Sequence, residues 1–130
     1  MEVSGMKKNS AAIDGGDWVG DIPGMGNLRL KVRGSTSRKV RKALADKISG
    51  NPNNQTEDSR DRVTAEVFAE SVLLDWENIT SGGEPVPYSE ETALQWLIDP
   101  DMDDFFRAVE YASNEVSRRH KEAVTEIAKN

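Results

Sequence analysis

The apolar residues between positions 65 and 76 recur with the spacing of an α-helix. Counted from the first, they fall at i, i+3, i+4, i+7, i+8 and i+11: Ala65, Phe68, Ala69, Val72, Leu73 and Trp76. This spacing places all of them on one helical face, while Glu66, Glu70 and Asp75 lie outside that face. The pattern predicts a helix over 65–76 whose apolar face must pack against other parts of the chain.

Three further segments carry the start and stop signals of helices. The first follows the hydroxyl-rich residues 35–37, repeats an apolar residue at every fourth position and ends at Gly50. The second begins after Ser89, whose side chain is suited to cap a helix. The third begins at Asp99 and Pro100, because aspartate caps helices and proline fits the first helical position. Together with the helix over 65–76, these signals predict four helices.

Residues 28–33 alternate apolar and basic side chains, which is the pattern of a β-strand with one buried face. A Pro23-Gly24 turn separates this run from Trp18 and Val19, so we expect a β-hairpin. Two strands alone are only marginally stable in water, and the hairpin must therefore pack against something else.

These elements predict a mainly α protein of the α+β class, in which an N-terminal β-hairpin is followed by four helices. The length of 130 residues is that of one domain, since typical domains have about 100–150 residues. Residues 1–15 are mostly small and polar, and we expect a disordered N-terminus there. Residues 49–61 contain no large apolar side chain, so we expect a flexible linker within a single domain over 16–130.

The net charge of −6 hides two opposed regions. Residues 27–47 carry eight basic residues and one acidic residue, whereas residues 57–110 carry fifteen acidic and three basic residues. Such a polarity has three interpretations: a basic element packed on an acidic one, a docking surface for a partner of opposite charge, or a nucleic-acid site. The basic segment lacks interleaved aromatic residues and any zinc-finger or clear helix-turn-helix signature, which weighs against nucleic acid.

Five residues are candidates for binding a partner. Four of them are basic residues of the predicted helix after residue 37, and they lie mainly on its solvent-facing side: Arg38, Lys39, Arg41 and Lys42. The fifth is Trp18, because tryptophan is over-represented in binding hot spots and the hairpin has little core of its own.

The sequence contains no set of residues that indicates catalysis, a cofactor or a metal. There is no cysteine, and the one histidine, His120, lies in the apolar stripe of the last helix, where a structural role explains it better than a proton switch or a metal ligand. Four acids match positions 1, 3, 5 and 12 of a calcium-binding loop: Asp99, Asp101, Asp103 and Glu110. The sixth position, which needs glycine, is Asp104, and helix capping explains the first acids without calcium.

Four short segments stand in a characteristic order along the chain. They are Asp17–Pro23 with Leu28–Gly34, Val72–Trp76, Gly83–Ser89, and Asp99–Met102 with Phe105–Val109. In this order and spacing, over residues 17–120, the chain resembles the tail assembly chaperones of long-tailed bacteriophages and prophages. The resemblance implies a non-catalytic protein that binds the tape measure protein and keeps it soluble while tail-tube subunits polymerise around it.

The resemblance has further implications. Many members of that family are made in two lengths by programmed ribosomal frameshifting, and the longer form recruits the major tail protein; this chain looks like the short form. It ends in Lys129-Asn130, which A-rich and slippery codons can encode, so we expect a frameshift site near the stop codon. The chain carries no apolar run long enough for a membrane span and no secretory signal, which favours the host bacterial cytoplasm.

Other interpretations stay open at this point. The protein could be a structural tail or head–tail component of the virion, or a small DNA-binding regulator that uses residues 29–47. The sequence leaves open whether the chain forms a homo-oligomer.

Overall fold

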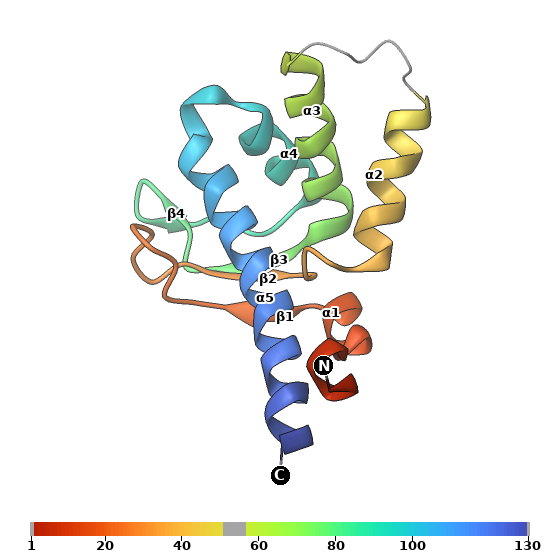
Figure 1. Cartoon of the computed structure of the whole chain (residues 1–130). Coiled ribbons are helices and arrows are strands. Elements are labelled where there is room, and N and C mark those ends of the chain that lie inside the picture. The colour runs from red at the N-terminus through yellow and green to blue at the C-terminus, as the bar shows by residue number, and fades with distance from the viewer. Residues whose placement is uncertain (1, 51–56, 130) are drawn as a thin grey trace.

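The computed structural model describes the backbone of residues 2–50 and 57–129, and the side chains within these ranges other than those of 57–60 and 122–129. Within this part of the chain, three strands form an antiparallel sheet in the order β1-β2-β3 (Figure 1). The strands are β1 (Asp17–Val19), β2 (Arg29–Val32) and β3 (Leu73–Glu77). The long helix α5 (Asp103–Lys129) crosses the sheet and contacts β1 and β2.

Helices and shorter elements make up most of the rest of the described chain. The described residues form α1 (Ser10–Gly15), α2 (Arg38–Gly50), α3 (Glu57–Val67), α4 (Glu90–Ile98) and α5, with 3₁₀ turns η1 (Val3–Met6) and η3 (Pro100–Met102), a π-helical turn η2 (Phe68–Val72), and a small hairpin of β4 (Thr80–Ser81) and β5 (Glu84–Pro85). None of the described helices has both the length and the apolar composition that a bilayer span requires. The fold is mixed α+β, and the predicted layout of an N-terminal hairpin followed by four helices is wrong.

The largest difference from the prediction concerns residues 65–76. The helix α3 continues into η2 and stops at Val72, and the next five residues form β3 against β2. Val32 pairs with Leu73 and Lys31 pairs with Asp75, so Leu74 is an extra residue that forms a bulge. The bulge places Leu73 and Trp76, three positions apart, on the same buried face. A spacing that indicates a helix is therefore satisfied by an irregular strand.

β3 gives the hairpin the support that it needs. Leu30 and Val32 of β2 are fully buried beneath α5, as the alternation predicts, while Arg29 lies on the other face and pairs with Glu77 of β3 at 3.3 Å. The backbone N–H of Arg33 donates to the carbonyl of Val72 at 2.9 Å. The second edge of β2 thus has hydrogen-bond partners, which a two-stranded hairpin would leave in water.

The N-terminus also differs from the expected disordered segment over 1–15. Residues 3–6 and 10–15 are helical, the Asn9 side chain caps α1 by accepting from the N–H of Ala12, and Ile13 is 1% exposed. The middle of the predicted linker over 49–61 lies outside the described residues, since 51–56 are not described, and its ends, 49–50 and 57–61, belong to α2 and α3. The single domain over 16–130 stays a prediction.

One hydrogen bond joins α1 to the start of α2, and it makes stability depend on pH. The hydroxyl of buried Ser37 donates to Asp14 Oδ1 at 2.6 Å, and this bond holds the pKa of the Asp14 carboxyl below its ordinary value. The folded state therefore holds the Asp14 proton less tightly than the unfolded chain. The stabilisation is fully present above the ordinary aspartate pKa and is lost as the pH falls through the lowered value.

We expect the replacement Asp14→Asn to reduce the acid sensitivity of the fold. The free energy of unfolding of the natural chain should fall between about pH 5 and about pH 3, and that of the variant should fall less. Urea titrations at a series of pH values measure this difference. Asp46→Asn, which changes an exposed carboxyl of α2, is the control and should keep the full slope.

Candidate partner-binding surfaces

The basic residues predicted to bind a partner lie together on α2. Arg38, Lys39, Arg41 and Lys42 are exposed along this helix, and none of them makes an ion pair with a side chain that the structure describes. Hydroxyl capping explains the start of the helix, because Ser37 Oγ accepts from the N–H of Lys39 at 3.2 Å. We call the exposed surface formed by these four residues with Leu44 and Ile48 the α2 face.

Other parts of the basic segment are neutralised within the molecule. Lys47 Nζ lies 3.1 Å from Glu66 and 3.2 Å from Glu70, and the hydrogen bond with Glu66 raises the pKa of Lys47. Burial raises the pKa of the Glu66 carboxyl, but hydrogen bonds from Lys47 and Arg62 outweigh burial and lower it overall. Intramolecular ion pairs thus engage Lys47 near the end of α2. The other four cations of the helix are exposed and form no such pair within the described residues.

The α2 face also carries apolar side chains. The predicted stripe of the helix is Val40, Leu44 and Ile48, but only Val40 packs against the core. Leu44 is 39% exposed and Ile48 is 57% exposed, because α2 stands at the margin of the molecule beside α3 (Figure 1). The helix therefore presents exposed apolar atoms as well as exposed cations, which is a composition suited to binding another chain.

Trp18, the fifth predicted residue, does not join this surface. It lies on β1, opposite Lys31 of β2, and its ring is 5.2 Å from the guanidinium carbon of Arg29. β1 lies at the foot of the sheet in Figure 1, well separated from α2. The structure brings four of the five predicted residues together and places Trp18 elsewhere.

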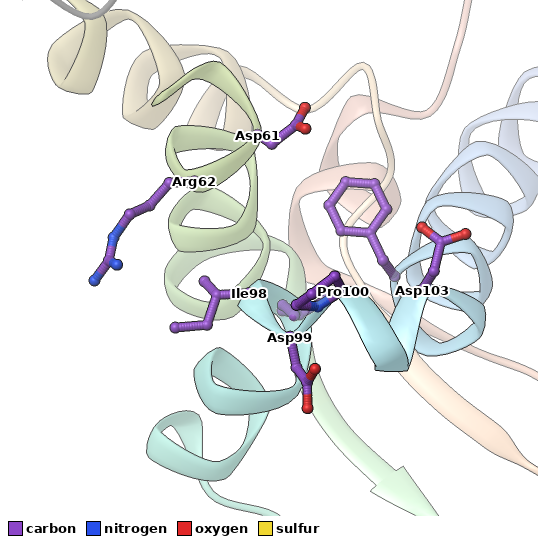
Figure 2. Close-up of a pocket in the computed structure, with 8 residues that line it drawn as sticks. Asp61, Arg62, Ile98, Asp99, Pro100 and Asp103 are labelled. Atoms are coloured by element: carbon purple, nitrogen blue, oxygen red, sulfur yellow. The ribbon is translucent and has the colours of Figure 1, made fainter. Parts of the chain in front are cut away.

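A second surface, which the sequence did not indicate, is a hollow of about 590 Å³ between α3 and the α4–α5 turn (Figure 2). Leu97, Ile98, Pro100 and Phe106 supply its apolar part. Its polar residues are three acids and one cation: Asp61, Asp99, Asp103 and Arg62. We call this site the acidic hollow.

The polar groups of the acidic hollow are positioned by local bonds. Asp99 caps η3 by accepting from the N–H of Asp101 at 2.9 Å, and Asp103 accepts from Arg107 Nε at 2.6 Å. Arg62 donates to Glu66 at 3.2 Å, and in Figure 2 its side chain points away from Asp103. Within the described residues, no three His, Asp or Glu side chains are placed to hold a metal ion.

Arg119 attaches α5 to β1, and His120 lies beside the same contact. His120 Nε2 lies 3.4 Å from Asp17 Oδ2, and Arg119 Nη1 lies 3.3 Å from the same oxygen. Arg119 also donates to the carbonyl of Trp18 at 3.1 Å. These contacts link positions about a hundred residues apart and belong to neither surface.

The comparison with protein families identifies the group to which the chain belongs. A family model described as YdaY prophage protein matches residues 32–130. No curated protein and no solved structure matches the chain. The matched region contains the α2 face and the acidic hollow, whereas Trp18 lies before it. Because the match covers most of its length, this chain belongs to the YdaY prophage protein family.

Proposed function

We propose that this prophage protein is a tail assembly chaperone that binds the tape measure protein in the host bacterial cytoplasm and acts without catalysis. Membership of a prophage family supports the general setting. The observation that carries the proposal is the α2 face, where Leu44 and Ile48 are exposed on the same helix as four exposed cations that make no ion pair with a described side chain.

The physical requirements of such a chaperone fit this surface. A tape measure protein is a long chain whose apolar faces stay exposed until the tail tube covers them. A protein that keeps it soluble must cover apolar atoms while its own outer surface remains charged. The binding must also be reversible. Charged groups speed the encounter of the two proteins, and a small apolar patch does not make their dissociation very slow.

Co-expression with the neighbouring tape measure gene tests the proposal directly. We expect the tape measure protein to move from the insoluble to the soluble fraction and to co-purify with this chain. Purified virions should lack this chain, since a structural tail component would be present in them. Salt-sensitive binding to random duplex DNA at near-micromolar affinity, without any effect on the tape measure protein, would contradict the proposal.

The proposal includes a longer, frameshifted product that recruits the major tail protein. The nucleotide sequence of the gene tests this part. We expect a slippery heptamer in the gene and an overlapping downstream frame, and the absence of both would contradict this part of the proposal.

Charge reversal on α2 should weaken binding of the tape measure protein. We expect the fourfold variant Arg38→Glu, Lys39→Glu, Arg41→Glu and Lys42→Glu to lose at least about tenfold in affinity, because four attractive contacts become repulsive. Pull-down with quantified bound fractions measures the loss, and thermal unfolding should show an intact fold.

A matched pair of variants separates the surface from net charge alone. Arg41→Glu with Lys42→Glu changes the net charge as much as Lys7→Glu with Lys121→Glu, which alters exposed lysines elsewhere. We expect only the first pair to reduce binding. Equal losses in both pairs would mean that the α2 face has no specific role.

A further inference from the structure

The acidic hollow and the α2 face have opposite charge, so they suit different ligands. We propose that the acidic hollow binds an amphipathic α-helix that carries basic side chains around an apolar stripe. The identification of this helix as a segment of the tape measure protein rests on the proposed function. The chemistry of the ligand does not, because it follows from the hollow itself.

The apolar part of the hollow requires an apolar ligand surface. Leu97 is nearly buried at its base, Phe106 is half-buried, and Ile98 remains 39% exposed. The volume of about 590 Å³ lies within the range of about 300–1,000 Å³ that is typical of binding pockets. Several side chains from one face of a ligand can therefore enter it together.

The charge of the hollow requires a basic ligand. Among the described residues that line it, the one cation is Arg62, which is hydrogen-bonded to Glu66. Arg107 neutralises Asp103, so Asp61 and Asp99 carry the remaining negative charge. Asp61 is exposed and makes no ion pair with a side chain that the structure describes. The hollow also lies within residues 57–110, where acids exceed bases by twelve. Nucleic acid and acidic peptides would be repelled, whereas lysine or arginine side chains would be attracted.

The walls of the hollow favour a helical ligand. They come from α3, from the end of α4 and from the start of α5, joined by the turn η3 (Figure 2). No strand residue is among the described residues that line the hollow, so an extended ligand would find no strand edge among them to pair with. An amphipathic helix inserts residues at i, i+3, i+4 and i+7 into such a space and keeps its own backbone hydrogen bonds.

Two synthetic peptides of eighteen residues test this inference on the full chain. Both carry leucines at i, i+3, i+4 and i+7 spacing, with lysine at the other positions in one peptide and glutamate in the other. We expect the lysine peptide to shift backbone amide signals of residues 61–62 and 97–106 in NMR titrations. The glutamate peptide should leave these signals in place.

Matched variants identify the contacts. Ile98→Asp and Leu44→Asp each place a charge on an apolar residue that is 39% exposed, one in the hollow and one on α2. Asp61→Lys and Asp46→Lys each reverse the charge of an exposed acidic residue, the first in the hollow and the second on α2. We expect Ile98→Asp and Asp61→Lys to lower the affinity for the lysine peptide by at least about tenfold. The two α2 variants should change that affinity by less than about twofold. Asp61 is exposed, so its variant should fold normally.

The results separate this inference from the proposed function. The inference is overturned if the lysine peptide fails to bind, if it shifts amides elsewhere, or if the hollow variants bind it as the natural chain does. If the lysine peptide binds the hollow but co-expression leaves the tape measure protein insoluble, the proposed function fails and the inference stands. If co-expression succeeds and the hollow variants bind the peptide unchanged, the inference about the hollow fails and the proposed function stands.

Discussion

Replacing Trp76 by alanine should lower the free energy of unfolding by about 3–5 kcal/mol, which is the usual loss for a large buried aromatic residue. Trp76 is 5% exposed and lies at the centre of an aromatic cluster. Its ring stacks on Trp96 at 5.0 Å and meets Tyr88 and Phe105 edge-on at 5.0 and 5.9 Å. Its indole N–H donates to the carbonyl of Val86 at 2.8 Å. Alanine would remove these contacts and leave a cavity that the rigid surroundings fill only partly.

Urea unfolding measures this effect. A loss of this size is a large part of a typical total stability of about 5–15 kcal/mol, so Trp76→Phe should be measured as a milder variant. Phenylalanine retains an aromatic ring but leaves the Val86 carbonyl without its donor, and it should lie between the natural chain and Trp76→Ala. Trp18→Ala is the control, since Trp18 is only partly buried and lies at the edge strand β1, so this change should cost clearly less than Trp76→Ala. Equal losses at the two tryptophans would contradict the described core.

Gly34→Ala is expected to destabilise the protein by about 1–3 kcal/mol, because the site has no room for a methyl group. A Cβ at Gly34 would lie 2.5 Å from Ser117 Oγ and 2.6 Å from Ile13 Cγ2. The N–H of Gly34 also donates to the carbonyl of Ile13 at 3.0 Å, so the backbone has little freedom to move away. Gly34 is the point where the end of β2 approaches both α1 and α5.

The control for Gly34 is another glycine of the same region. A Cβ at Gly15 meets no atom within 4 Å, and Gly15 has no positive φ angle. Gly15→Ala should leave stability unchanged or raise it by up to about 1 kcal/mol, through the lower entropy of the unfolded chain. If thermal unfolding shows Gly34→Ala to be as stable as Gly15→Ala, the close packing of α1, β2 and α5 is wrong.

Local patterns in the sequence predicted some elements well. The alternation over 28–33 indicated a strand with Leu30 and Val32 inside, and both are fully buried. Ser89 caps α4 by accepting from the N–H of Thr92, and Asp99 caps η3, as their positions before apolar stretches suggested. In each case the residues that form the pattern are also the residues that form the element, so no contact with a distant part of the chain is needed to predict it.

Elements that depend on distant residues were predicted wrongly or were not found. Leu73 and Trp76 have a helical spacing, but pairing with β2, some forty residues earlier, turns their segment into a bulged strand. Residues 10–15 contain one large apolar side chain, and α1 is held by contacts of Ile13 and Asp14 with Gly34 and Ser37. The acidic hollow joins Asp61 to Asp99, and nothing in the sequence near either residue indicates the other.

The sequence by itself determined the opposed charges of the two halves, the position of α2 and the identity of four exposed cations on it, because charge and helical periodicity are local properties. Only the tertiary structure decided that Lys47 pairs with Glu66 while those four cations stay open, that Trp18 lies apart from them, and that β3 exists. The physical reason is hydrogen bonding between residues far apart in the sequence. β2 has two edges, and its second edge finds hydrogen-bond partners only because residues 73–77 form a strand instead of continuing the helix.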